Sequence, residues 1–275
     1  MLYKEFTLSE KYPDSTLTAY VCGDGLTRKP RPALIVCPGG AYSIVAKRES
    51  EPVVRRFFGE GMNVYLLRYS VAPNACNYAP LIQASMAIKL VRERAREDNT
   101  DPERVFIIGF SAGGHVAASA GTMWKLSEVR NALGITDDPA GERINRPDGM
   151  ILCYPVITGE SPYGHRGSLK NWSGRKEPTQ EDIDSFSIEK HVDADSSPAF
   201  IWQTFTDGLP VQNSLIMMNA LATAGVPFEA HIFPDGPHGI ALCNEETCEG
   251  MPHLVVPHAE VWSSLAVRWI RDFKG

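Results

Sequence analysis

The sequence predicts an α/β protein with a doubly wound, mostly parallel central sheet and helices on both faces. Short apolar runs rich in β-branched and aromatic residues recur along the chain, and polar residues do not alternate cleanly within them. Such runs are typical of strands that are buried on both faces. Segments with helical periodicity separate the runs, which favours β-α-β units and a parallel sheet.

Six runs are expected to form the parallel strands, and they occupy residues 33–37, 63–69, 105–110, 149–155, 199–205 and 228–233. The stretch TLTAYVC at 16–22 predicts an antiparallel strand at one edge of the sheet. Short β-branched runs bounded by turn residues are typical of strands. Both predictions depend on this pattern alone.

Three segments between and after these strands are predicted to be helices, at 80–98, 211–225 and 259–273. The first begins with Pro80, a residue that suits a first helical turn, and carries an apolar stripe. The second ends at Gly225 and is followed by Pro227, a usual helix stop. Residues 157–198 do not continue the alternation of strands and helices, because this stretch is rich in Gly, Ser, Pro and charged residues. We expect a long loop excursion there.

Length and composition favour one globular domain over residues 1–275, because no repeat, low-complexity tract or Gly/Ser linker divides the chain. The chain is 43% hydrophobic and 22% charged, with a net charge of −6, and its one basic cluster is VRERAR. This balance argues against nucleic acid and against an anionic membrane surface as partners. No apolar run is long enough to span a bilayer. A neutral or weakly charged small molecule is the expected ligand.

The start of the chain, MLYKEFTLSEKYPDSTL, has no apolar signal-peptide core, so we expect a cytoplasmic protein. In that compartment its cysteines would be reduced thiols. They are Cys22, Cys37, Cys76, Cys153, Cys243 and Cys248. A bridge between the closely spaced Cys243 and Cys248 stays open, as does assembly into a homo-oligomer.

The stretch VFIIGFSAGGH, at 105–115, runs from a predicted strand into a predicted helix through a G-x-S-x-G turn. Small residues are required where a helix starts this close to a strand, and Gly109 and Gly113 supply the room. Ser111 would then protrude as a candidate nucleophile, with the N–H of Ala112 pointing into the same space. The alternative is a strand-helix turn in which Ser111 only caps the helix.

A serine hydroxyl needs a base within hydrogen-bond reach and a group that orients that base. Asp207 is the one carboxylate between residues 199 and 228, and it directly follows a predicted strand. His238 follows the last strand, in PDGPHG. The chain order Ser, acid, His is that of α/β-hydrolases. Other carboxylates remain alternatives for the acid, namely Asp184, Asp193 and Asp195 in the excursion and Asp235 beside His238.

The other polar clusters have simpler interpretations. His115 would pack beneath the G-x-S-x-G turn. His165 and His191 belong to the excursion, where solvent exposure is expected and a role on the substrate side is the alternative. The spacing of the cysteines and histidines between residues 243 and 258 fits no common zinc site. We therefore expect neither a metal nor an organic cofactor.

The loop that follows strand 33–37 reads CPGGAYS, and its two glycines would let the main chain approach a ligand closely. In this layout the loop is expected to supply a second backbone donor for an oxyanion. Aromatic residues near the presumed site could stack on a sugar or an aryl group, and they make candidate pocket residues: Tyr42, Tyr163, Trp172 and Phe205.

With these motifs, the sequence resembles the esterase/lipase branch of the α/β-hydrolase superfamily that contains acetyl esterases and acetylxylan esterases. The resemblance covers nearly the whole chain, including PGGAYSIVAKRESEPVVRRFFGEGMNVYLLRYSVAP and DPERVFIIGFSAGGHVAAS. It implies that the amides of Gly40 and Ala41 join Ala112 as oxyanion donors. Ala41 stands where a third glycine is usual, and TDGLPV is one residue shorter than the usual acid loop.

The resemblance implies a serine carboxylesterase that hydrolyses short-chain acyl esters through an acyl-enzyme. Acetyl is the expected acyl group, and acetylated sugars or xylo-oligosaccharides are the expected substrates. The alternatives are a feruloyl esterase, a peptidase of the prolyl-oligopeptidase type, and a non-catalytic ligand-binding relative. The presence of His238 argues against the last of these, because non-catalytic relatives often lack the base.

Overall fold

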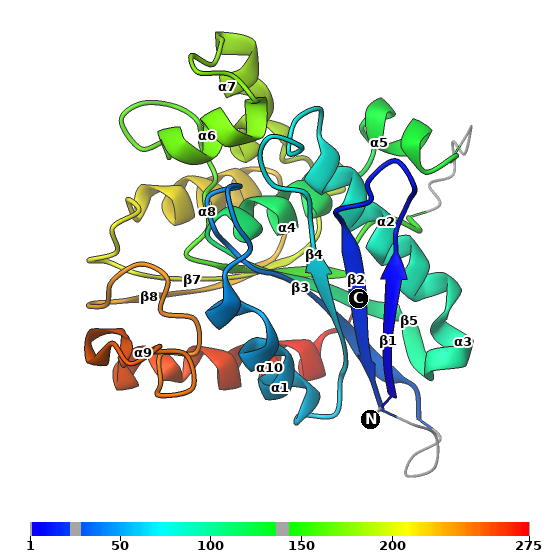
Figure 1. Ribbon diagram of the computed structural model, residues 1–275. Coiled ribbons are helices and arrows are strands. Elements are labelled where there is room, and N and C mark those ends of the chain that lie inside the picture. Colours follow the sequence, from blue (N-terminus) through cyan, green and yellow to red (C-terminus); the bar gives the residue numbers. More distant parts are fainter. Residues whose placement is uncertain (1, 23–28, 136–142, 275) are drawn as a thin grey trace.

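The computed structural model describes residues 2–22, 29–135 and 143–274 of the chain. Eight strands form one sheet in the order β1-β2-β4-β3-β5-β6-β7-β8 (Figure 1). Strands β3 to β8 are parallel, whereas β2 pairs antiparallel with β4 and β1 antiparallel with β2. The predicted fold class, a doubly wound and mostly parallel sheet, is therefore confirmed. The strands are β1 (Leu2–Thr7), β2 (Thr16–Val21), β3 (Arg31–Cys37), β4 (Asn63–Arg68), β5 (Thr100–Phe110), β6 (Gly149–Cys153), β7 (Ala199–Thr204) and β8 (Phe228–Phe233).

The outermost strand differs from the prediction. Strand β2 is antiparallel, as expected, but β1 lies outside it and forms the edge of the sheet. Most residues of β1 are exposed. Within β1 only Phe6 is partly buried and packs against the core, so the strand has too short an apolar pattern to be predicted from the sequence.

Helices cover both faces of the sheet (Figure 1). They are α1 (Glu51–Phe58), α2 (Ala79–Glu93), α3 (Ala95–Asp98), α4 (Ala112–Thr122), α5 (Ser127–Ala132), α6 (Arg166–Ser173), α7 (Gln180–Phe186), α8 (Gln212–Thr223), α9 (Pro257–Glu260) and α10 (Trp262–Asp272), with 3₁₀ turns η1 (Lys47–Glu49), η2 (Ile188–His191) and η3 (Pro252–Leu254). Among these helices, none has the length and apolarity that a membrane span requires.

The core has two parts, one on each side of the sheet. Along β3, Ala33, Ile35 and Cys37 pack into the part shared with α2, α4 and α8. The intervening Leu34 and Val36 pack into the part shared with α1 and α10. Successive side chains of a strand point to opposite faces, so a strand covered on both sides needs apolar residues at every position.

The excursion expected as a loop between β6 and β7 contains α6, α7 and η2. Figure 1 shows α6 and α7 at the top of the molecule, above α4 and α8. The segment is anchored from below, because Asn213 in α8 accepts hydrogen bonds through Oδ1 from the amides of Ile157 (2.9 Å) and Thr158 (3.2 Å). All six cysteines are free thiols, including Cys243 and Cys248.

Candidate active site

Ser111 occupies a strained turn between two regular elements. Strand β5 ends at Phe110 and α4 begins at Ala112, which leaves Ser111 alone at the junction with φ 53° and ψ −117°. A non-glycine residue costs free energy in this region unless its surroundings hold it there. Here the amide of Ser111 donates to the carbonyl of Cys153 (3.0 Å), and its own carbonyl accepts from Val156 (3.0 Å).

The glycines of the G-x-S-x-G turn are required by close backbone contacts. A Cβ on Gly109 would lie 2.0 Å from the carbonyl oxygen of Gly113. A Cβ on Gly113 would lie 2.1 Å from the carbonyl oxygen of Cys37 in β3. Helix α4 therefore starts directly against both β5 and β3, and this packing holds Ser111 at the end of the strands.

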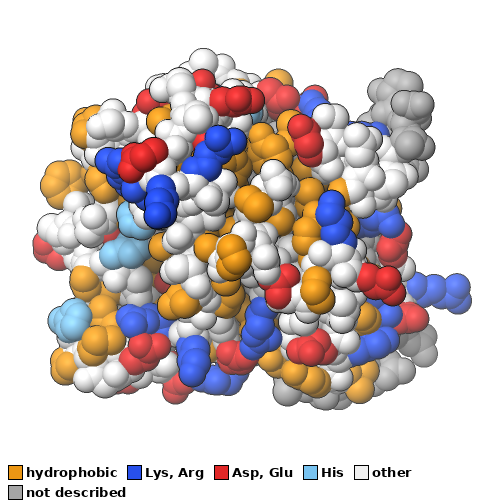
Figure 2. All heavy atoms as spheres, turned by 45° about the horizontal axis from the view of Figure 1, so that its top comes forward, with side chains coloured by type: hydrophobic (Ala, Val, Ile, Leu, Met, Phe, Trp, Pro, Cys, Tyr) orange, Lys and Arg blue, Asp and Glu red, His pale blue; other side chains and the backbone are white. Residues whose placement is uncertain are grey.

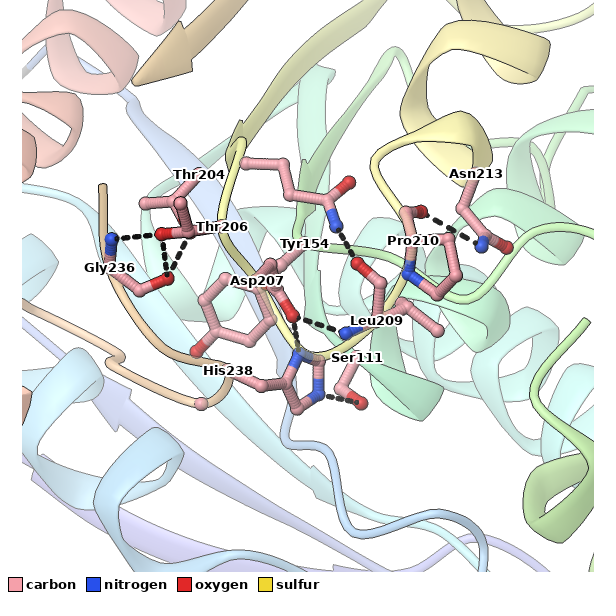
Figure 3. Close-up of polar contacts among 12 residues, drawn as sticks. Ser111, Tyr154, Thr204, Thr206, Asp207, Leu209, Pro210, Asn213, Gly236 and His238 are labelled. Atoms are coloured by element: carbon pink, nitrogen blue, oxygen red, sulfur yellow. Dashed lines mark hydrogen bonds and ion pairs between the residues drawn. The ribbon is translucent and has the colours of Figure 1, made fainter. Parts of the chain in front are cut away.

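His238 links Ser111 to Asp207 by two hydrogen bonds (Figure 3). Its Nε2 lies 2.8 Å from Ser111 Oγ, and its Nδ1 lies 2.7 Å from Asp207 Oδ1. Asp207 comes from the loop after β7 and His238 from the loop after β8. The carboxyl ends of neighbouring parallel strands meet at one edge of the sheet, so three residues far apart in sequence lie together.

Of the carboxylates that the sequence left open, Asp207 is the one that contacts His238. Asp184 pairs with Lys190 (2.5 Å), and Asp195 pairs with Lys125 (2.5 Å). Asp193 also lies 3.3 Å from Lys125. These three ion pairs lie on the surface of the protein, where their side chains are exposed to solvent.

The Asp207 side chain is 1% exposed. Its Oδ1 also accepts a hydrogen bond from the amide of Leu209 (2.6 Å), whereas its buried Oδ2 has no partner among the described residues. The acid loop and the histidine loop are tied together nearby, because Thr204 Oγ1 donates to the carbonyl of Gly236 (2.6 Å; Figure 3). This hydrogen bond helps to hold the Asp207 carboxylate next to the imidazole of His238.

The pKa of His238 is raised above its ordinary value. Burial is the largest single influence and opposes protonation, but the hydrogen bond and charge of Asp207, together with the charge of Glu49, outweigh it. The imidazole also has an aromatic neighbour. Tyr154 lies edge-on against it, with ring centroids 5.1 Å apart (Figure 3).

The glycine-rich loop 38–42 turns back sharply above Ser111. Gly40 has φ 127° and Ala41 has φ 53°, so alanine adopts the left-handed conformation that a glycine would take more easily. Tyr69 donates to the carbonyl of Pro38 (2.5 Å), and Asn171 donates through Nδ2 to that of Ala41 (2.8 Å). Within the described chain, the amides of Gly40 and Ala41 have no acceptor of their own.

A pocket of about 500 Å³ opens over Ser111. Its lining includes Gly40, Ala41, Glu49, His165 and His238. Figure 2, which brings the α6–α7 side forward, shows acidic and basic side chains interspersed with apolar ones over this face of the molecule. That mixture gives no large single-sign field to select a strongly charged ligand.

None of the four aromatic residues predicted for the pocket lines it. Tyr42 is buried, and its hydroxyl lies 2.6 Å from His115 Nδ1. Trp172 is also buried and packs edge-on against Phe186. Tyr163 and Phe205 are on the surface, 37% and 66% exposed. The position of these residues in loops and in the excursion was a poor guide to where their rings point.

Several residues that line the pocket were not predicted as site residues, and two of them are Glu49 and His165. Glu49 sits at the end of η1 and is buried, although its neighbours in AKRESEP are mostly polar. His165 caps α6, where its Nδ1 accepts from the amide of Ser168 (3.1 Å). The cap makes Nδ1 an acceptor, so the ring proton of neutral His165 lies on Nε2. No signal in the sequence separates Glu49 from an ordinary surface residue, whereas the place of His165 in the excursion allowed a role on the substrate side.

The chain is similar to known hydrolases. The BD-FAE family model matches residues 24–221. An endo-1,4-beta-xylanase B from Butyrivibrio fibrisolvens is 36% identical over 85% of this chain and 36% of its own length. An acetylxylan esterase from Xylanibacter ruminicola is 28% identical over 76% of this chain and 41% of its own length. The chain thus spans well under half of either relative.

Solved structures give matches over nearly the whole chain. An acetyl ester-xyloside bifunctional hydrolase from Caldicellulosiruptor lactoaceticus superposes with a TM-score of 0.77 at 36% identity, covering 94% of this chain and 87% of its own. The carboxylesterase Cest-2923 from Lactobacillus plantarum superposes with a TM-score of 0.83 at 28% identity, covering 99% and 98%.

Proposed function

Because the chain belongs to the BD-FAE family of α/β-hydrolases, we propose that it is a serine carboxylesterase acting on short-chain acyl esters. Acetyl esters of sugars or xylo-oligosaccharides are the proposed substrates. The observation that carries the proposal is the hydrogen-bonded series Ser111, His238, Asp207, in which a serine on a strained turn meets a base that is itself oriented by a carboxylate.

In the proposed reaction, Ser111 Oγ attacks the ester carbonyl while His238 Nε2 takes the serine proton. Asp207 holds the imidazole in the tautomer with its proton on Nδ1 and stabilises the imidazolium that forms. The tetrahedral intermediate collapses as His238 returns the proton to the departing alcohol. Water then attacks the acyl-enzyme and gives up a proton to His238, and His238 returns that proton to Ser111 Oγ as the bond to the acyl group breaks and the acid product leaves.

The proposed oxyanion donors are the amides of Gly40, Ala41 and Ala112. The first two are unpaired in the described chain and line the pocket, and Ala112 is the first residue of α4. Amide donors at the start of a helix, and in a loop whose backbone is held by hydrogen bonds, need no rearrangement when charge develops on the carbonyl oxygen. The hydrogen bonds from Tyr69 to the Pro38 carbonyl and from Asn171 to the Ala41 carbonyl hold the glycine-rich loop in this way.

The proposed acyl preference rests on the relatives and on the pocket lining. Two of the similar proteins are named for acetylxylan or acetyl ester-xyloside hydrolysis. Apart from the two histidines, no aromatic side chain of the described residues lines the pocket. A feruloyl ring would therefore find little to stack on, whereas a small acyl group needs no such partner.

Hydrolysis rates on a matched ester series test this proposal. The purified protein is assayed with p-nitrophenyl acetate, butyrate and octanoate, with methyl ferulate, and with acetylated xylo-oligosaccharides by acetate release. We expect the highest kcat/KM on acetyl esters and measurable acetate release from the oligosaccharides. Faster turnover of octanoyl or feruloyl esters would overturn the acyl assignment, and no turnover of any ester would overturn the function.

A further inference from the structure

Glu49 is a buried carboxylate between the glycine-rich loop and the catalytic histidine. Its residue is 3% exposed, and it lines the pocket that contains Ser111. A Cβ placed on Gly39 would lie 2.7 Å from Glu49 Oε2 and 3.0 Å from Ser111 Cβ, so the carboxylate and the nucleophile border the same small space. The mechanism above assigns Glu49 no part.

Both carboxylate oxygens of Glu49 accept hydrogen bonds. Oε2 accepts from the amide of Gly39 (2.7 Å), and Oε1 accepts from the hydroxyl of Tyr154 (2.7 Å). The Tyr154 oxygen in turn accepts from the amide of Ala241 (2.9 Å), which leaves its own proton for Glu49. A group that meets donors on both oxygens is satisfied as an anion, whereas a protonated carboxyl would lack an acceptor.

No cation in the described chain forms an ion pair with Glu49. Burial raises its pKa, and the hydrogen bonds from Tyr154 and Gly39, with the nearby charges of His238 and Arg48, oppose the rise. A buried carboxylate held by hydrogen bonds rather than by a salt bridge is costly to retain. That cost suggests a role in the site.

We propose that Glu49 is a positioning residue for ester hydrolysis, holding the oxyanion loop through Gly39 and the His238 ring through Tyr154, and stabilising the imidazolium with its charge. The inference rests on the proposed function. The hydrogen bond to Gly39 fixes the peptide that precedes the Gly40 and Ala41 amides. The bond to Tyr154 fixes the ring that lies edge-on against His238.

The charge of Glu49 adds to that of Asp207 in raising the pKa of His238. The other titratable or charged groups near His238 and Glu49 are His165 at the start of α6, Arg48 in η1, and the neutral Tyr69, Tyr154 and Cys153. A negative charge near a histidine favours its protonated form. Removing the charge of Glu49 should therefore lower the pKa of His238.

Glu49→Gln tests the proposal, because glutamine keeps the shape and an acceptor oxygen but loses the charge. With p-nitrophenyl acetate we expect kcat to fall by about tenfold or more with little change in KM. The reason is that Glu49 positions the oxyanion loop and His238, and these groups act mainly in the transition state. We also expect the acidic limb of the kcat/KM profile to move to lower pH by roughly half a unit. Unchanged kcat and an unmoved limb would overturn the proposal.

Glu51→Gln is the matched control. Glu51 lies two residues further along in α1 and pairs with Arg68 (2.6 Å), outside the pocket lining. We expect kcat and the acidic limb of this variant to match wild type. A merely structural role for Glu49 would lower the melting temperature and the folded fraction but leave the position of the limb unchanged, and this result would also overturn the proposal.

Tyr154→Phe keeps the inference testable if Glu49→Gln fails to fold. It removes the hydroxyl that Glu49 accepts from and retains the ring beside His238. We expect a lower kcat with an unchanged circular dichroism spectrum, and wild-type kcat would overturn the inference. Failure of the proposed function looks different, because wild-type protein would then release no p-nitrophenol above the Ser111→Ala background.

Discussion

The carbonyl oxygen of Cys37 lies 2.1 Å from the place that a Cβ on Gly113 would take. Helix α4 and strand β3 thus meet through bare backbone, directly beneath Ser111. We expect Gly113→Ala to lower the free energy of unfolding by about 1–3 kcal/mol, the usual cost of overpacking, and to lower kcat because the helix start must shift. Gly59→Ala is the control, since its Cβ would lie 3.3 Å from the carbonyl oxygen of Arg55. Chemical denaturation measures both, and equal stability of the two variants would contradict the argument.

Ser111 carries both the proposed chemistry and a strained backbone, with φ 53°. Ser111→Ala should lower ester hydrolysis by about 10⁴-fold or more and leave stability almost unchanged, because alanine keeps the strain. Ser111→Gly should be equally inactive but more stable than Ser111→Ala by about 1 kcal/mol, since glycine relieves the strain. Activity within tenfold of wild type in either variant would remove Ser111 as nucleophile.

The raised pKa of His238 predicts the pH dependence of the reaction. The imidazole must be neutral to accept the serine proton, so kcat/KM should fall as the pH drops through the pKa of His238. Because that pKa lies above the ordinary histidine value, the acidic limb should have its midpoint above about 6.5. A profile that stays flat down to pH 4.5 would show that no histidine acts as the base.

Asp207→Asn tests the orienting acid. Asparagine cannot stabilise the imidazolium and favours the wrong tautomer, so kcat should fall by roughly 10³- to 10⁴-fold with little change in KM. The same change at Asp184, Asp193, Asp195 or Asp235 should cost less than tenfold. A large loss at one of those four positions, with Asp207→Asn near wild type, would transfer the role and leave Ser111 and His238 in place.

The sequence by itself determined the class of the sheet and the order of the candidate residues along it. Buried strands and amphipathic helices each have a characteristic spacing of apolar residues along the chain. This spacing can be read from the local sequence, because it reflects which faces of each element are buried. The serine, the aspartate and the histidine each follow a strand, and parallel strands bring such positions to one edge. That much required no coordinates. Strand β1 was missed because its residues are mostly exposed and only Phe6 is partly buried against the core, which leaves too short an apolar pattern.

Tertiary structure alone decided where the side chains of the loops point. Tyr42 belongs to the glycine-rich loop and Trp172 to the excursion, but both side chains are buried, with Tyr42 in contact with His115 and Trp172 in contact with Phe186. Glu49 lies in a polar stretch yet is buried beside Ser111, and Asp207 rather than four other carboxylates contacts His238. Loop side chains have no period. Their direction depends on hydrogen bonds and packing with segments that are distant along the chain, which local sequence does not encode.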